Sequence, residues 1–152
     1  MIETLLGEPE NSTRRDLGDL DELVDGFSAS GLTISVERFG RLDHLTAVQQ
    51  LAAYRILEQS LTNSLKHAGA GAVVRLALQG ADDGVAISIS SRPDGENHTV
   101  LDGNSDGRGL LGMIERARLA GGWLDAGADD DVPGGYLVTA YIPAVRQELA
   151  SA

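Results

Sequence analysis

The hydrophobic positions of the chain change their period several times, and each change marks an expected element. Between residues 16 and 31, apolar side chains recur every three or four residues, with Asp16 placed to cap the start and Gly31 to end the segment. This pattern predicts an amphipathic helix. The next stretch, LTISVERF, alternates apolar and polar residues and is rich in β-branched side chains, so we expect a half-buried strand.

The longest regular segment runs from about Leu45 to about Ala68 without Pro or Gly, and its apolar residues predict one long helix. Two strands, AVVRLALQ and GVAISISS, are then expected to pair antiparallel around the turn GADDG. A helix from about Leu110 to Leu119, ended by a Gly pair, and the strands WLDAGA and YLVTAYIP complete the pattern.

This order of elements predicts an α+β fold, a two-layer sandwich with helices on one face of a mixed, mainly antiparallel sheet. The 152 residues suffice for one domain with a single core. We assign residues 1–15 to a linker or frayed arm, 16–143 to the domain and 144–152 to a tail. The long polar stretch 92–108 is expected to form a functional loop or lid.

Composition excludes several classes of function. A net charge of -11 argues against nucleic acid as a partner, because phosphate backbones bind clustered Lys and Arg. The absence of Cys removes disulfides and cysteine chemistry and is compatible with the cytoplasm. No apolar run approaches the ~20 residues needed to cross a bilayer, so we expect no direct membrane contact. A phosphate-bearing ligand remains compatible, since backbone amides and helix N-termini can hold anions.

The long helix carries an unusual polar group in its second half. Its members, which share one broad side of the helix, are Gln59, Asn63, Lys66 and His67. Another side carries the leucine stripe that should face the core, formed by Leu57, Leu61 and Leu65. From this helix alone the polar group either faces water or lines a pocket.

A second candidate feature is the stretch DGRGLLGMIERA. Gly107 and Gly109 directly precede the helix expected from Leu110, so free backbone amides and the positive end of the helix dipole are available to a phosphate. The dinucleotide-binding fingerprint is a poor match, because no parallel βαβ unit surrounds these glycines. A different kind of phosphate site is therefore indicated.

Together these stretches resemble a known family. YRILEQSLTNSLKHAGA is similar to the N-box of GHKL-type (HATPase_c) ATPases, and GRGLLGMIERARLAGGWLDAG resembles the G2 region of NarL-class sensor histidine kinases. PGGYLVTAYIP resembles their closing glycine pair and last strand. The similarity runs from about Leu17 to Pro143. It implies a Bergerat-type fold that binds ATP and Mg²⁺ between the N-box helix and a lid, in the catalytic domain of a two-component histidine kinase.

The resemblance also assigns residues. Asn63 falls on the position of the Mg²⁺-binding Asn, and Lys66 and His67 fall on the basic positions that approach the phosphates. The glycines that match those near the triphosphate are Gly107, Gly109 and Gly112. The further positions implied to border the nucleotide are Arg108, Leu110, Met113 and Thr139.

Two departures from the family pattern concern catalysis and base binding. Gln59 stands where a Glu is usual, and the neighbouring Glu58 points about 100° away on an ideal helix, so these two are the candidate catalytic residues. Ser91 stands where an Asp accepts a hydrogen bond from adenine, with Asp94 and the retained Gly95 shortly after it. These departures favour an alternative: a degenerate domain of the same fold, with weak or no ATP turnover, acting as a regulatory or interaction module.

The resemblance implies partners outside the chain. The phosphoacceptor His is expected on a dimerisation domain of the parent kinase, which passes the phosphoryl group to a response regulator, and His44 and His98 are interpreted as surface residues. The parent is either a cytoplasmic protein or a membrane-anchored kinase with this part in the cytoplasm. We expect a monomer or weak dimer. An anti-sigma-factor serine kinase is a third possibility, which GLLGMIERA matches less well.

Overall fold

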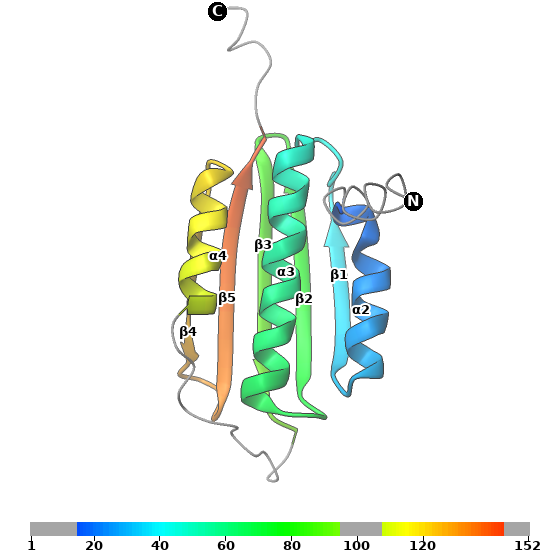
Figure 1. Cartoon of the computed structure of the whole chain (residues 1–152), viewed down its shortest axis with the longest axis vertical. Coiled ribbons are helices and arrows are strands. Elements are labelled where there is room, and N and C mark those ends of the chain that lie inside the picture. Colours follow the sequence, from blue (N-terminus) through cyan, green and yellow to red (C-terminus); the bar gives the residue numbers. More distant parts are fainter. Residues whose placement is uncertain (1–14, 95–107, 145–152) are drawn as a thin grey trace, which may run out of the picture.

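The computed structural model describes residues 15–94 and 108–144 (Figure 1). Its helical elements are the 3-10 turn η1 (Leu17–Asp19) and the helices α2 (Leu20–Ala29), α3 (Ala47–Ala68) and α4 (Arg108–Leu119). Its strands are β1 (Thr33–Phe39), β2 (Val73–Ala81), β3 (Gly84–Arg92), β4 (Trp123–Asp129) and β5 (Gly135–Pro143). The expected order of elements is confirmed. Most of the predicted arm, lid and tail lies outside the described residues.

The strands form one five-stranded sheet in the order β1-β2-β3-β5-β4. The β1–β2 pair is parallel and the other three pairs are antiparallel, which confirms the mixed, mainly antiparallel sheet. Figure 1 shows α2, α3 and α4 side by side over one face of this sheet, with α3 over its centre. The two-layer α+β architecture predicted from the sequence is therefore correct.

The core lies between the helices and the sheet. Alternate residues of each central strand point toward the helices, which is the period expected of a sheet with one covered face. Those fully buried there include Val74, Leu76, Leu78, Val85, Ile87, Ile89 and Ile142. Leu57 and Leu61 of the predicted stripe are fully buried against them, and Leu65 packs at the margin. The hydrophobic face of α3 thus fixes which of its sides remains available for a ligand.

Local capping explains where the helices begin. The Asp16 side chain caps η1 in a reciprocal capping box, and Thr46 caps α3 in the same way through the backbone of Gln49, so α3 starts just after the predicted Leu45. Helix α4 begins at Arg108, earlier than predicted, and Gly109 lies inside its first turn rather than before it. Within the described part of the chain, no helix is both long and apolar enough to cross a lipid bilayer.

Candidate functional site

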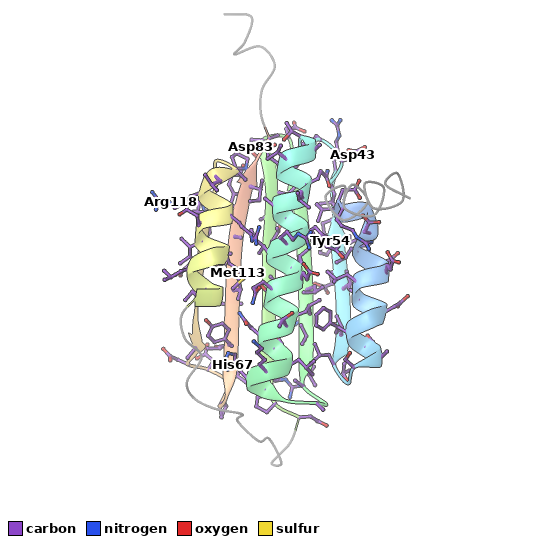
Figure 2. All side chains as sticks on the ribbon, viewed as in Figure 1. Asp43, Tyr54, His67, Asp83, Met113 and Arg118 are labelled. Carbon is purple, nitrogen blue, oxygen red and sulfur yellow. The ribbon has the colours of Figure 1, made fainter. Side chains whose placement is uncertain are left out.

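The polar half of α3 lies on the flank that faces α4. The hydroxyl of Ser60 donates to the sulfur of Met113 at 3.4 Å, and both side chains are buried, so this contact joins the two helices at their centres. Figure 2 shows Met113 between α4 and α3. Asn63 is about 60° from Ser60 on an ideal helix, which turns its side chain toward the start of α4.

Gly109 brings the backbone of α4 close to two side chains of α3. A Cβ atom at this position would lie 3.1 Å from Nε2 of Gln59 and 3.6 Å from Oδ1 of Asn63. A side chain here would therefore crowd both amides, and glycine leaves the space open. The structure thus places together the two features that were 46 residues apart in the sequence, Asn63 and Gly109.

The two amides of α3 are themselves joined. Nε2 of Gln59 donates a long hydrogen bond to Oδ1 of Asn63, at 3.4 Å, and both residues are partly buried. The Asn63 amide oxygen, to which the family resemblance gives the Mg²⁺-binding role, is therefore in contact with a donor. This pair and the first turn of α4 form the centre of the candidate site.

Glu58 lies on a different flank of α3. Its carboxylate forms a 2.8 Å ion pair with Arg55, one turn earlier. Burial is the main cause that raises the pKa of Tyr54, and the negative charge of Glu58 raises it further. Tyr54 faces α2, where it lines a cavity together with Leu23 and Phe27. Because α3 is a continuous helix, it lacks the distortion that would turn the Glu58 side chain onto the flank that bears Gln59. The geometry does not support the predicted catalytic role of Glu58.

The last turn of α3 carries the basic residues predicted to approach phosphates. Lys66 is exposed and His67 is partly buried. Figure 2 shows His67 at the end of α3 that lies beside the start of α4. Positive charge at a helix C-terminus interacts favourably with the helix dipole, so a structural role accounts for part of this placement. Neither residue has a salt bridge among the described residues, which leaves the Lys66 ammonium and the His67 ring available to an anion.

Ser91 lies near the end of β3, on the face of the sheet that the helices cover. Its side chain is 7% exposed, and its direct cross-strand neighbours are Val74 and Tyr136. No hydrogen-bond partner of its hydroxyl occurs among the described residues. Burial, with a smaller contribution from Asp125, raises the pKa of Tyr136, so this phenol is neutral at physiological pH. Two neutral hydroxyl-bearing residues therefore adjoin at this point.

Asp94 follows Ser91 into the loop region at the same end of the sheet. A Cβ atom at Gly71, which has a φ of +88°, would lie 3.7 Å from Cβ of Asp94. Gly71 belongs to the loop after α3, so Asp94 lies beside the end of the helix that carries His67. The Asp94 carboxylate is exposed and follows the buried Pro93, three residues after Ser91.

Thr139 lies on the opposite face of the sheet. Its neighbours in β5, Val138 and Ala140, are buried beneath the helices, so Thr139 points to the open face, where it pairs with Ser88 and Asp125. The structure does not support its predicted contact with a nucleotide. Tyr136, which was not among the predicted residues, lies instead on the helix-covered face beside Ser91. The strand alternation that buries Val138 would have identified it, because Tyr136 is two residues away and on the same face.

The remaining predicted residues divide into three groups. Gly95 and Gly107 lie outside the described residues, and the side chain of Arg108 is not described. Leu110 packs partly buried against the core, and Met113 is 1% exposed, so packing explains both. Gly112 is exposed, and a Cβ atom there would meet nothing within 4 Å among the described residues.

The site offers few ligands of its own to a metal ion. Residues 15–94 and 108–144 contain no group of three or more His, Asp or Glu side chains able to hold one. Asn63 contributes a single amide oxygen. Mg²⁺ commonly keeps only one or two protein ligands and takes the rest from phosphates and water. The residues present therefore fit a cation that enters with a phosphorylated ligand, and do not form a cage for a free ion.

Solved structures share the fold of this chain. The chain superposes on the mycobacterial sensor histidine kinase MprB with a TM-score of 0.61 at 16% identity, over 84% of this chain and 95% of that one. The fold is that of histidine kinase catalytic domains. The catalytic domain of the histidine kinase ThkA, in a nucleotide-free form, gives a TM-score of 0.57 at 14% identity, over 84% of this chain and 93% of that one.

A longer kinase matches over part of its length. The blue-light activated histidine kinase EL346 from Erythrobacter litoralis gives a TM-score of 0.65 at 17% identity, over 88% of this chain and 43% of the kinase. No family model matches the sequence, and no curated protein sequence matches it. At these identities the likeness shows the fold, and the function must be argued from the site.

Proposed function

We propose that this chain is the ATP-binding catalytic domain of a NarL-class two-component sensor histidine kinase, acting in the cytoplasm with Mg²⁺. The reaction would transfer the γ-phosphoryl group of ATP to a His on a dimerisation domain outside this chain, and from there to a response regulator. One observation carries the proposal: the close approach of Gly109 in α4 to Gln59 and Asn63 in α3. The histidine kinase fold supports it.

Each part of the site has a physical task in this proposal. The first-turn amides of α4 and the side chains of Lys66 and His67 would hold the phosphates, since phosphoryl transfer depends mainly on positioning and charge neutralisation. Mg²⁺, held by Asn63 and the phosphates, would neutralise charge that develops during transfer. Ser91 and Tyr136, which are neighbours on the helix-covered face of the sheet, would border the adenine base.

A degenerate module remains a second candidate, and specific residues favour it. Gln59 can donate and accept hydrogen bonds but cannot accept a proton at neutral pH. Ser91 is a neutral acceptor, and a hydrogen bond to it is weaker than one to a carboxylate. A domain with these two residues would bind ATP weakly or turn it over slowly while keeping its fold for regulation or interaction.

Calorimetric titration with a nonhydrolysable ATP analogue, with Mg²⁺ and with EDTA, tests nucleotide binding. We expect a dissociation constant below the millimolar range with Mg²⁺, equivalent to a binding free energy of about -4 kcal/mol or better. Absence of binding at millimolar analogue in both conditions would refute the proposal.

Two variants of neighbouring α3 residues sharpen this test. Asn63→Ala should abolish the difference between Mg²⁺ and EDTA. Thr62→Ala is the matched control, because its hydroxyl donates to the Glu58 carbonyl one turn earlier, at 2.9 Å, and leaves the site intact. An Asn63→Ala protein that keeps the full Mg²⁺ effect would refute the metal assignment.

Phosphorylation distinguishes the kinase from the module. The longer polypeptide that carries the acceptor His should become labelled with γ-labelled ATP, and the label should be stable to alkali and lost in acid. Analogue binding without any label would favour the module.

A further inference from the structure

The contact between Gln59 and Asn63 involves Oδ1 of Asn63, the oxygen that would bind Mg²⁺ in the proposed function. Nε2 of Gln59 donates to Oδ1 of Asn63 at 3.4 Å, four residues apart on the same flank of α3. Gly109 lies beside the pair: a Cβ atom at residue 109 would stand 3.1 Å from Nε2 of Gln59, so the glycine leaves space next to the two amides. Oδ1 is the acceptor end of the Asn63 amide, and it is engaged by a donor in this structure.

An amide pair of this kind has two arrangements. The oxygen and nitrogen ends of a carboxamide have nearly the same shape, so rotating both groups by 180° exchanges their roles with little change in packing. In the alternative arrangement, Nδ2 of Asn63 donates to Oε1 of Gln59, and Oδ1 of Asn63 turns away from the pair. In that second arrangement both lone pairs of the Asn63 oxygen are free for a cation, whereas in the first one of them accepts from Gln59.

We propose that Gln59 is a positioning residue that covers the metal-facing oxygen of Asn63 and thereby weakens the dependence of nucleotide binding on Mg²⁺. This inference rests on the proposed function, because it assumes that a nucleotide brings the cation to Asn63. The Gln59 donor and the cation compete for the electron density of the same amide oxygen, so the hydrogen bond weakens the bond that Oδ1 can form with the cation. Turning both amides into the second arrangement would remove this competition at the cost of reorganising the pair.

A carboxylate at position 59 would act in the opposite way. A carboxylate only accepts hydrogen bonds, so it would accept from Nδ2 of Asn63 and hold the Asn63 oxygen outward. It would also add a negative charge that attracts the cation. The identity of residue 59 thus decides the orientation of Asn63 as well as the charge of the site.

The experiment compares analogue affinity in Mg²⁺ with affinity in EDTA, and the ratio of the two reports the contribution of the cation. Gln59→Met keeps the length of the side chain and removes both the donor and the acceptor. We expect this variant to raise the ratio roughly two- to tenfold, the effect of one net hydrogen bond. Gln59→Glu should raise the ratio further, because it adds charge as well as orientation.

The matched control is Gln79→Met on the exposed outer side of β2, which makes the same chemical change far from α4 and should leave the ratio unchanged. Side-chain amide NMR gives a second readout. The resonances of Gln59 and Asn63 should shift with Mg²⁺ and analogue together, and much less with analogue in EDTA. A structural role alone would not produce this cation dependence.

The outcomes separate the inference from the proposed function. A ratio that is unchanged or lower in Gln59→Met overturns the inference, since Gln59 would then be a ligand or a bystander. If Gln59→Met fails to fold, a ratio in Gln59→Glu no greater than in the wild type overturns it. Absence of analogue binding in every variant, with and without Mg²⁺, refutes the proposed function itself.

Discussion

Gln49, in the first turn of α3, donates a hydrogen bond from Nε2 to the carbonyl oxygen of Ala120, at 3.2 Å, just beyond the end of α4. The same amide group also donates to the carbonyl oxygen of Pro143 at the end of β5. Its side chain is 4% exposed, and its backbone takes part in the cap of α3. One buried amide thus ties α3, α4 and β5 together at the end of the domain away from His67.

Gln49→Leu is expected to lower the free energy of unfolding by about 1–3 kcal/mol, because two backbone carbonyls lose their partner in or near the core. Urea denaturation followed by circular dichroism measures this loss. Gln79→Leu, at an exposed position of β2, is the control and should change stability by no more than about 0.5 kcal/mol. Equal effects of the two substitutions would show that the Gln49 contacts contribute nothing special.

Gly109→Ala should lower affinity for an ATP analogue several-fold, since its methyl group would stand 3.1 Å from Nε2 of Gln59. The control is Gly26→Ala in α2, where a Cβ atom meets nothing within 4 Å and the substitution should stabilise by roughly 0.5–1 kcal/mol. Thermal unfolding and calorimetry together separate the two effects. Unchanged affinity of the Gly109→Ala protein would mean that the close contact of Gly109 with Gln59 and Asn63 does not contribute to ligand binding.

The sequence determined the elements better than their relation to one another. Periodicity placed α3 within two residues of its observed start, and alternation identified each strand, because both signals are local. The side of α3 that bears Asn63 was also predictable, since the leucine stripe had to face the core. The start of α4 was misplaced by two residues, because a glycine such as Gly109 reads as a helix boundary when the contact that requires it is out of view.

Two of the predicted site residues, Thr139 and Glu58, lie away from the contact between Asn63 and Gly109. Thr139 was assigned by motif, although the alternation of β5 already directed it to the face opposite Val138. Glu58 depended on a distortion of α3 that the continuous helix does not have. The hydrogen bond between Gln59 and Asn63 was not foreseen, because residues four apart on a helix contact one another only if their rotamers and neighbours allow it.

Alkaline pH should destabilise the domain through its tyrosines. Burial is the largest cause that raises the pKa of Tyr54, Tyr136 and Tyr141. Above about pH 10, the usual pKa of an unfolded tyrosine, the unfolded chain therefore loses protons that the folded chain still holds, and stability falls as pH rises. Ultraviolet titration should show phenolate appearing at higher pH in the native protein than in urea. Coincident titration curves would contradict this expectation.

Ser91→Asp tests whether Ser91 contacts the adenine base of the nucleotide. A carboxylate there would accept a stronger hydrogen bond from the amino group of adenine, and we expect affinity for the ATP analogue to rise about fivefold. Ser90→Asp is the matched control, because the preceding residue points to the open face and pairs with Arg75 and Leu137. If the affinity rises equally in both variants, or in neither, Ser91 does not contact the adenine base.

The same substitution should reveal its cost in the absence of nucleotide. At 7% exposure the new carboxylate loses hydration, so its pKa in the folded state rises above the unfolded value of about 3.9. A raised pKa of an acid destabilises the fold at pH values above the unfolded pKa, and acidification toward pH 4 removes the penalty. Thermal unfolding of Ser91→Asp should therefore approach the wild-type midpoint as pH falls. A deficit independent of pH would instead indicate that the larger side chain disrupts packing against Val74 and Tyr136.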